Sequence, residues 1–258
     1  MRDSPSFVSV SLLFYNIGAN DIHPHRFYLS PPFCDSIGLK RISRSKERCW
    51  TNMKGKGTYA IGAAVLLLVF AALAATMRKD GPTALDEALG DPIRAMRSDA
   101  LTPLFKAMSP LVSSPVFAVL LVAFAALFAF AFKKRLEPLL LVVNLTVAYG
   151  LYRGLKNVFE RPRPSEPMIE ALGYSFPSGN ALMAASFYGL IALLLYRHWR
   201  KRRKGAAWTA AVVGIALIVS IGVSRVYLGV HYPSDIVAGY AIGGAWMLLC
   251  AAASAKRS

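Results

Sequence analysis

The chain has 258 residues, of which 55% are hydrophobic and 17% carry a charged side chain, and its formal net charge is +16. The lysines and arginines cluster between long uncharged runs, which is typical of an integral membrane protein and argues against a soluble basic protein. The positive charge is therefore weak evidence for nucleic-acid binding and is better interpreted as loop charge that sets orientation and meets anionic lipid headgroups.

Residues 1–52 differ from the rest of the chain. They lack a sustained apolar run and contain two of the three cysteines, which follow no CxxC spacing and support neither a disulfide scaffold nor a zinc site. Met53 is followed by Lys-Gly-Lys-Gly and then by the first apolar run, as at the cytoplasmic start of a membrane protein. We expect residues 1–52 to be a disordered or misannotated extension and residues 53–258 to form a membrane domain.

Six uncharged runs follow, and together they predict an all-α protein with six transmembrane helices. The runs are Thr58–Met77, Val112–Phe132, Pro138–Tyr152, Ala181–Tyr196, Ala206–Val223 and Ile236–Ala253. The first two are long enough to cross the hydrocarbon core, which takes about 20 helical residues. The other four must borrow flanking residues, and the third is expected to continue through Lys156 toward Phe159.

The basic clusters alternate between the connections, which predicts an orientation. They precede the first run, separate the second from the third, and follow the fourth and the sixth; if every run crosses, all four lie on one side. That side is cytoplasmic by the positive-inside bias. The segments 78–111, 153–180 and 224–235 then lie on the extracytoplasmic face of a cell membrane. In the first of them, Ala84–Met96 is interrupted by Gly90 and Pro92 and predicts a pair of short interfacial helices that act as a connector.

Lys156, Arg163 and Pro164 form the first of three polar motifs at the ends of apolar runs. The prolines of the Arg-Pro-Arg-Pro turn stop the helix and stiffen the loop that carries Arg163. Arginine suits bidentate phosphate contact, and lysine acts as a point charge. The alternative is that both are snorkelling side chains at a membrane interface.

Pro177-Ser178-Gly179-Asn180 opens the fourth run and is the second motif. Amides at a helix N-terminus, a hydroxyl and a glycine that permits close approach can cradle an anion. A plain N-cap is the alternative, because serine and asparagine are ordinary capping residues.

Ser224-Arg225, His231 and Asp235 form the third and sharpest motif. A neutral imidazole nitrogen can attack phosphorus, while a carboxylate holds the other ring N–H and stabilises the charged form. The four-residue spacing places His231 and Asp235 on one face if the sixth helix begins near Pro233. Asp235 is also the only carboxylate after Glu170.

The three ordered motifs resemble those of the type-2 phosphatidic acid phosphatase superfamily of membrane lipid phosphatases. The patterns Lys-x6-Arg-Pro, Pro-Ser-Gly-His and Ser-Arg-x5-His-x3-Asp are met at every position except Asn180, where the family has histidine. The resemblance implies six helices with the active site at the extracytoplasmic ends of helices 3–6, and neither metal nor cofactor. It implies His231 as nucleophile forming a phosphohistidine, with Asp235 as its orienting partner. The phosphate cradle that it implies consists of Lys156, Arg163, Ser178, Gly179 and Arg225.

Asn180 stands where the family has its general acid. Lower activity, a substrate that needs little protonation, or replacement by Glu166, Tyr174 or Tyr232 are all open explanations, as is an engineered change. His198 lies in a basic cytoplasmic loop and is not expected to substitute.

The leading interpretation is a lipid phosphatase acting on undecaprenyl pyrophosphate, with phosphatidylglycerophosphate or phosphatidic acid as alternatives. A vanadate-dependent haloperoxidase has a similar anion site, but the six spans argue against one. Because of Asn180, a non-catalytic lipid-phosphate binder or a transport-type membrane protein is the alternative from another class. The expected partners are the lipid substrate and the bilayer; the sequence does not indicate an oligomeric state.

Overall fold

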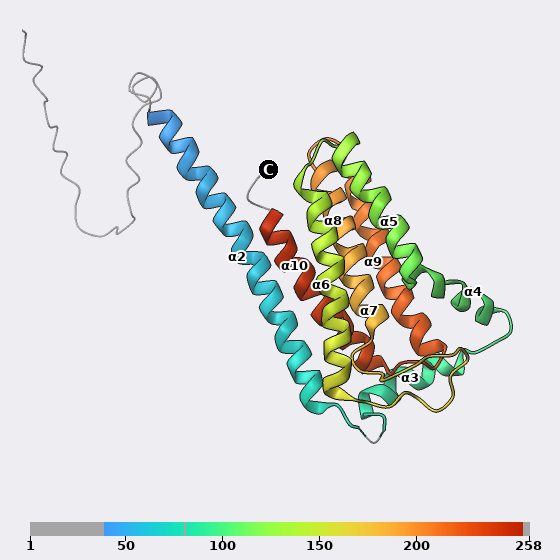
Figure 1. The fold of residues 1–258 in the computed structure, drawn as a ribbon. Coiled ribbons are helices and arrows are strands. Elements are labelled where there is room, and N and C mark those ends of the chain that lie inside the picture. The colour runs from blue at the N-terminus through green and yellow to red at the C-terminus, as the bar shows by residue number, and fades with distance from the viewer. Residues whose placement is uncertain (1–38, 80, 255–258) are drawn as a thin grey trace, which may run out of the picture. The chain divides into compact units, whose positions relative to one another are not determined.

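The computed structural model describes residues 39–79 and 81–254, with side-chain environments from residue 57 onward. Residues 48–258 form one compact unit, and every contact described below lies within it. Figure 1 shows the helices, and the described residues contain no strand, so the predicted all-α class is confirmed. The elements are α2 (Leu39–Thr76), α3 (Ala84–Ala95), α4 (Leu101–Ala107), the 3-10 helix η1 (Ser109–Val112), α5 (Ser114–Ala126), the π-helix η2 (Leu127–Ala131), α6 (Leu136–Phe159), α7 (Gly179–Met183), the π-helix η3 (Ala184–Tyr188), α8 (Gly189–Trp199), α9 (Lys204–Tyr227) and α10 (Pro233–Ser254).

Six segments of the described chain are long and apolar enough to cross a membrane, which confirms the six predicted spans. They are Gly57–Thr76, Ser114–Ala131, Leu136–Phe159, Gly179–Trp199, Lys204–Tyr227 and Pro233–Ser254. The third continues to Phe159 as expected, and the fourth consists of α7, η3 and α8 in succession. Large apolar side chains such as Leu68, Val122 and Ile215 are exposed on these helices, as expected for surfaces that face lipid.

The fourth span is packed against α6, α9 and α10 and forms the centre of the apolar core. A polar cluster joins the fourth span to α6 and α10: Ser186 donates a hydrogen bond to Asn144 Oδ1 at 2.9 Å, and the Trp246 indole donates to the Asn144 carbonyl at 3.1 Å. Cys250 Sγ lies 3.6 Å from the Asn144 amide nitrogen, so this cysteine belongs to the helix packing. Such side-chain hydrogen bonds hold helices together where lipid supplies no polar partner.

Glycines on α10 let its backbone lie against the start of the fourth span. A Cβ atom at Gly243 would lie 2.3 Å from the Leu182 carbonyl oxygen, and one at Gly239 would lie 2.5 Å from that of Ser178. At the same contact the Ser178 N–H donates to the Asp235 carbonyl oxygen at 3.0 Å. The close approach therefore holds the second and third motifs together.

Helix α3 corrects one prediction. Gly90 and Pro92 do not divide Ala84–Met96 into two helices; α3 runs through both, and the second short helix is α4. A capping box closes the first turn, in which Thr83 and Asp86 each bond the other's backbone N–H. Packing of α3 against α9 and α10 adds to this cap and outweighs the low helix propensity of glycine and proline.

The predicted boundary at residue 52 falls inside α2, which begins at Leu39. Residues 39–52 are therefore helical. Residues 1–38 lie outside the described residues, so their assignment as an extension stays a prediction.

The glycine contact predicts a stability difference between two otherwise similar changes. Gly243→Ala should destabilise the protein by about 1–3 kcal/mol, because the added methyl group overpacks a backbone contact. Gly150→Ala on α6 is the matched control, since its Cβ would meet nothing within 4 Å and alanine favours a helix. Thermal unfolding in detergent measures both. A Gly243→Ala variant as stable as Gly150→Ala would show that the two backbones can separate freely.

Candidate active site

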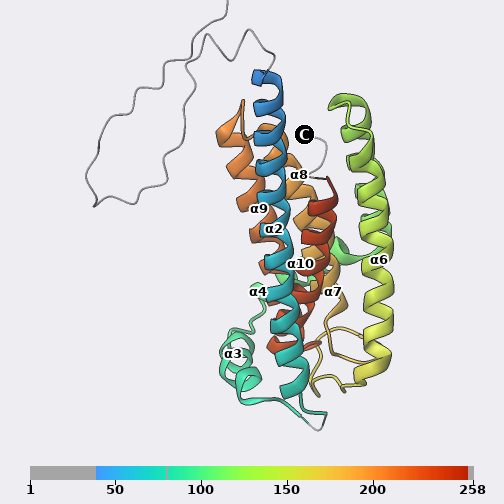
Figure 2. The same cartoon turned by 90° about the vertical axis from the view of Figure 1, so that its left-hand side faces the viewer.

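The three motifs meet at one end of the helices. The C-terminal ends of α6 and α9 and the N-terminal ends of α7 and α10 lie together there, and α3 lies beside them in the view turned by 90° (Figures 1 and 2). Each motif lies at an end of a membrane-spanning segment, so the alternating directions of these segments bring together residues that are far apart in the sequence.

His231 lies in the short connection between α9 and α10 and is only 2% exposed. Asp235 is fully buried in the first turn of α10, which begins at Pro233 as the sequence predicts. The His231 Nδ1 atom lies 3.6 Å from Asp235 Oδ2, slightly beyond hydrogen-bond distance, and has no hydrogen-bond partner. The Tyr232 N–H donates to the same Oδ2 at 2.9 Å and fixes the carboxylate beside the imidazole.

Arg163 lies on the other side of the imidazole. Its Nη1 atom is 3.4 Å from His231 Nε2. Three backbone carbonyl oxygens hold the guanidinium: Val230 at 2.6 Å, Gly173 at 2.9 Å and Leu172 at 3.0 Å. A cation is thus fixed next to the ring nitrogen that faces away from Asp235.

Burial controls the protonation of His231. It lowers the pKa of the imidazole to about 4, although Asp235 acts in the opposite direction; Arg163 and Lys156 lower the pKa further. The ring is therefore neutral at pH 7. With the Nδ1 proton directed at Asp235, a tautomer inferred from the neighbouring groups, Nε2 is unprotonated, and among the described residues its lone pair accepts only the long contact from Arg163 Nη1 at 3.4 Å.

Tyr152, which the sequence analysis did not single out, connects the first two motifs. The ammonium nitrogen of Lys156 lies 5.0 Å from the centre of the Tyr152 ring, and the Lys156 side chain is largely buried. The same ring packs on Gly179, where a Cβ atom would lie 2.3 Å from it. Glycine is thus required at 179 by this contact, independently of any ligand.

Ser178 and Asn180 flank Gly179 at the start of α7. Ser178 is the N-cap, and its Oγ atom accepts a long hydrogen bond from the Ala181 N–H at 3.4 Å. Asn180 lies in the first helical turn and is partly exposed. The interpretation of Ser178 as an N-cap is therefore correct. At 3.4 Å, however, the hydrogen bond from Ala181 to the serine hydroxyl is weak.

Arg225 lies in the last turn of α9 and is 4% exposed. Its Nη2 atom donates to the Ser109 hydroxyl of η1 at 2.9 Å, while its Nε atom has no hydrogen-bond partner. The Arg225 carbonyl accepts from the Val230 N–H at 3.1 Å and so closes the turn that carries His231. The structure places Arg163 and Asp235 directly at the imidazole, whereas the Arg225 side chain contacts η1.

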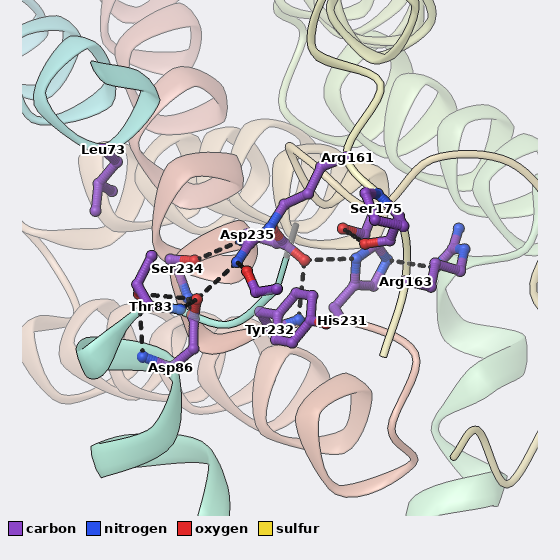
Figure 3. A network of polar contacts seen from close by, with 12 residues as sticks. Leu73, Thr83, Asp86, Arg161, Arg163, Ser175, His231, Tyr232, Ser234 and Asp235 are labelled. Atoms are coloured by element: carbon purple, nitrogen blue, oxygen red, sulfur yellow. Dashed lines mark hydrogen bonds and ion pairs between the residues drawn. The ribbon is translucent and has the colours of Figure 1, made fainter. Parts of the chain in front are cut away.

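The sequence analysis missed two charged residues, Arg161 and Asp86, both fully buried. Arg161 Nη1 donates to Asp235 Oδ1 at 2.7 Å, and its Nη2 donates to Asp86 Oδ2 at 2.8 Å (Figure 3). Asp86 therefore makes α3 part of the site's support, which corrects the prediction of a simple connector. The Thr83-x-x-Asp86 spacing signals a helix cap, but no local pattern reveals a contact with residue 161.

The residues considered as replacements for the missing acid make different contacts in the described part of the chain. The Tyr174 hydroxyl donates to Glu160 at 3.4 Å, and the Arg161 guanidinium lies 4.1 Å from the centre of the Tyr232 ring. The Glu166 backbone carbonyl accepts from Arg97 at 3.3 Å, a contact that does not involve the carboxylate. His198 stacks on Phe132 with ring centres 3.8 Å apart, at the other end of the fourth span.

Comparisons with known proteins identify the family of the chain. Residues 137–258 match the model of the PAP2 superfamily. The chain is 31% identical over 179 residues to phosphatidylglycerophosphatase B of Bacillus subtilis, covering 69% of this chain and 87% of that protein. It is 32% identical over 120 residues to undecaprenyl-diphosphatase of Sulfolobus acidocaldarius, covering 43% of this chain and 52% of the relative.

A solved structure shares the fold. It is the crystal structure of a transmembrane PAP2 type phosphatidylglycerolphosphate phosphatase from Bacillus subtilis, with a TM-score of 0.69 and 28% sequence identity. The match covers 76% of this chain and 97% of the solved one. The chain belongs to the PAP2 superfamily, and it is a multi-pass membrane lipid phosphatase.

Proposed function

We propose that this phosphatase removes the terminal phosphate of a polyprenyl pyrophosphate, best represented by undecaprenyl pyrophosphate, through a phosphohistidine on His231. The observation that carries the chemistry is the position of one neutral imidazole between a cation and a carboxylate. Arg163 Nη1 lies 3.4 Å from Nε2, and Asp235 Oδ2 lies 3.6 Å from Nδ1. The reaction draws on these side chains and uses neither metal nor cofactor.

In the first step the Nε2 lone pair of His231 attacks the terminal phosphorus. The P–N bond forms, the anhydride P–O bond breaks, and the lipid monophosphate leaves with the bonding electrons. The ring becomes cationic, because the Nδ1 proton stays in place. Asp235 stabilises this charge, and the 3.6 Å gap to Nδ1 shortens as the charge develops, as catalytic hydrogen bonds often do once substrate binds.

In the second step water attacks the phosphorus of the phosphohistidine. The P–N bond breaks, its electrons return to Nε2, and dihydrogen phosphate leaves with both water hydrogens. Arg163, Lys156 and Arg225 neutralise the non-bridging oxygens in both transition states, which is the main requirement of phosphoryl transfer. The weakly engaged hydroxyl of Ser178 and the close approach allowed by Gly179 complete the proposed cradle.

Asn180 is the reason for preferring a pyrophosphate. An asparagine donates a hydrogen bond but delivers no proton at neutral pH. A phosphate monoester expels an alkoxide, which is a strong base, whereas a pyrophosphate expels a lipid monophosphate, which leaves with hydrogen-bond and cationic support alone. Loss of a general acid therefore weighs less on the pyrophosphate.

Phosphatidylglycerophosphate is the second candidate, favoured by the relative named phosphatidylglycerophosphatase B, which this chain matches over 87% of its length. Phosphatidic acid is a third, and a non-catalytic lipid-phosphate binder is the alternative outside enzymes. Purified protein assayed in detergent with each lipid, with chelator present, separates these candidates. Release of inorganic phosphate from the polyprenyl pyrophosphate at the highest kcat/KM is the expected result; no release from any lipid would refute hydrolysis.

The roles of three residues can be tested together. His231→Ala should abolish turnover, and Asp235→Asn should lower kcat by about 10⁴, the loss known for an equivalent change in a protease triad. Arg225→Ala should lower turnover severely, because a cationic contact to the transferring phosphoryl group is lost. His198→Ala, at the other end of the span, is the matched control. Near wild-type kcat in His231→Ala would mean that another residue is the nucleophile.

Restoring the family's histidine at position 180 tests the leaving-group argument. Asn180→His should raise monoester hydrolysis more than pyrophosphate hydrolysis, because general-acid assistance contributes about 10²–10⁴ in rate where the leaving group is a strong base. The measurement is kcat/KM of both proteins on both substrates. Equal gains, or an unmodified enzyme that prefers the monoester, would contradict the proposed specificity.

We propose that the site faces the extracytoplasmic side, from the alternation of basic clusters. In a variant without Cys34, Cys49 and Cys250, a membrane-impermeant thiol reagent should modify Ser165→Cys in intact cells and spare Arg203→Cys. Both cysteines should react after detergent treatment. The reverse pattern in intact cells would place the site in the cytoplasm.

A further inference from the structure

Arg161 joins two carboxylates from distant parts of the chain. Its guanidinium, fully buried in the loop after α6, lies between Asp86 of α3 and Asp235 of α10, at 2.8 and 2.7 Å (Figure 3). The Ser234 hydroxyl and the Gly81 carbonyl accept further hydrogen bonds from it at 2.8 and 3.1 Å. The planar fork of arginine suits such a set of acceptors, because its donors point in fixed directions.

Both carboxylate oxygens of Asp86 accept hydrogen bonds. Its Oδ2 atom accepts from the backbone N–H and the hydroxyl of Thr83 as well as from Arg161. Its Oδ1 atom accepts from the Ser234 N–H at 2.8 Å, the residue immediately before Asp235. Burial raises the pKa of the Asp86 carboxyl, but the hydrogen bonds from Ser234, Arg161 and Thr83 outweigh it and leave the pKa below its ordinary value. Asp86 is thus an ionised group attached to the start of α10.

We propose that Asp86 and Arg161 are positioning residues for the reaction at His231: Arg161 fixes the Asp235 carboxylate, and Asp86 balances the charge of Arg161. This inference rests on the proposed role of His231 as nucleophile. The buried chain of contacts runs from Asp86 through Arg161 and Asp235 to the imidazole (Figure 3), and its three side-chain distances are 2.8, 2.7 and 3.6 Å.

Asp86 sets the net charge of the buried cluster that it forms with Arg161 and Asp235. Arg161 alone would neutralise Asp235 and weaken its support for the cationic ring formed in the first step. With Asp86 the three groups keep a single net negative charge next to His231. That charge matters because Arg163 and Lys156 both oppose a cationic ring. The adjacent Tyr232 adds no charge at pH 7, because burial raises the pKa of its hydroxyl.

The competing explanation is a purely structural role, in which the network only attaches α3 to the start of α10. The two explanations differ in what Asp86→Asn does to the imidazole. Removing one negative charge should lower the pKa of His231 and disfavour the phosphohistidine cation. If the role is purely structural, Asp86→Asn should change the stability of the protein and leave the pKa of His231 unchanged.

The experiment compares Asp86→Asn with Asp91→Asn in the purified full-length protein. Asp91 is the matched control because it lies on the same helix, carries the same charge and is largely exposed, and among the described residues it pairs with Arg94. The chain has four histidines, so the His231 signal in a histidine-labelled NMR titration is assigned by its loss in His231→Asn. Kinetics use the lipid phosphate with the highest kcat/KM for the unmodified enzyme.

Asp86→Asn should lower kcat by roughly 10–100-fold with little change in KM, the range known for outer partners of metal-bound histidines. It should also lower the His231 pKa, and Asp91→Asn should do neither. Adding Arg161→Gln to Asp86→Asn restores the net negative charge and should return the pKa toward its original value. Unchanged kcat and unchanged pKa in a folded Asp86→Asn variant would overturn the inference.

Arg161→Lys keeps the inference testable if Asp86→Asn does not fold. Lysine preserves the charge but lacks the forked guanidinium, so kcat should fall while thermal stability is largely retained. An unchanged kcat would overturn the positioning role. Failure of the proposed function gives a different pattern. An enzyme that hydrolyses no lipid phosphate, yet shows the pKa response to Asp86→Asn, would refute the reaction and leave the electrostatic link in place.

Discussion

The buried bridge of Arg161 between Asp86 and Asp235 is the interaction on which the rest of the site depends. Isolated charges are very costly to remove from water, and loss of one partner would leave the others unpaired in an apolar setting. The bridge therefore forms only when α3, the loop after α6 and the start of α10 meet in one arrangement. That arrangement also places Asp235 beside His231, so the same contacts that satisfy the buried charges fix the carboxylate 3.6 Å from the imidazole.

Backbone contacts fix the remaining parts of the site. Glycines 239 and 243 bring α10 against the start of the fourth span, and three carbonyl oxygens hold the guanidinium of Arg163 before any substrate arrives. A cation that is already oriented loses little entropy when it binds phosphate, and it acts on the transition state without reorganisation. For the proposed binding of a phosphate, the cation of the site is thus oriented by packing and by carbonyl dipoles rather than by flexible side chains.

The sequence predicted the parts of this molecule that depend on local pattern. The six spans follow from hydropathy, and the start of α10 at Pro233 follows from the tolerance of proline at a helix start. The prediction of a broken helix at Gly90 and Pro92 was wrong, because tertiary packing and the Thr83 cap outweigh propensity. The roles of Asp86 and Arg161 could not be predicted, because their partners lie about 75 to 150 residues away along the chain and no periodicity encodes such a pairing. Likewise, nothing local indicates that the Tyr152 ring fills the space left by Gly179.

The central claim is that His231 becomes phosphorylated, and a trapped phosphoenzyme tests it most directly. The enzyme would be mixed with a lipid pyrophosphate carrying ³²P in the terminal phosphate and quenched with alkali within one turnover. The account predicts a protein-bound label that is stable to alkali, labile to acid, and located on the peptide containing His231. Release of phosphate at the normal rate with no such label, or a label on another residue, would contradict it.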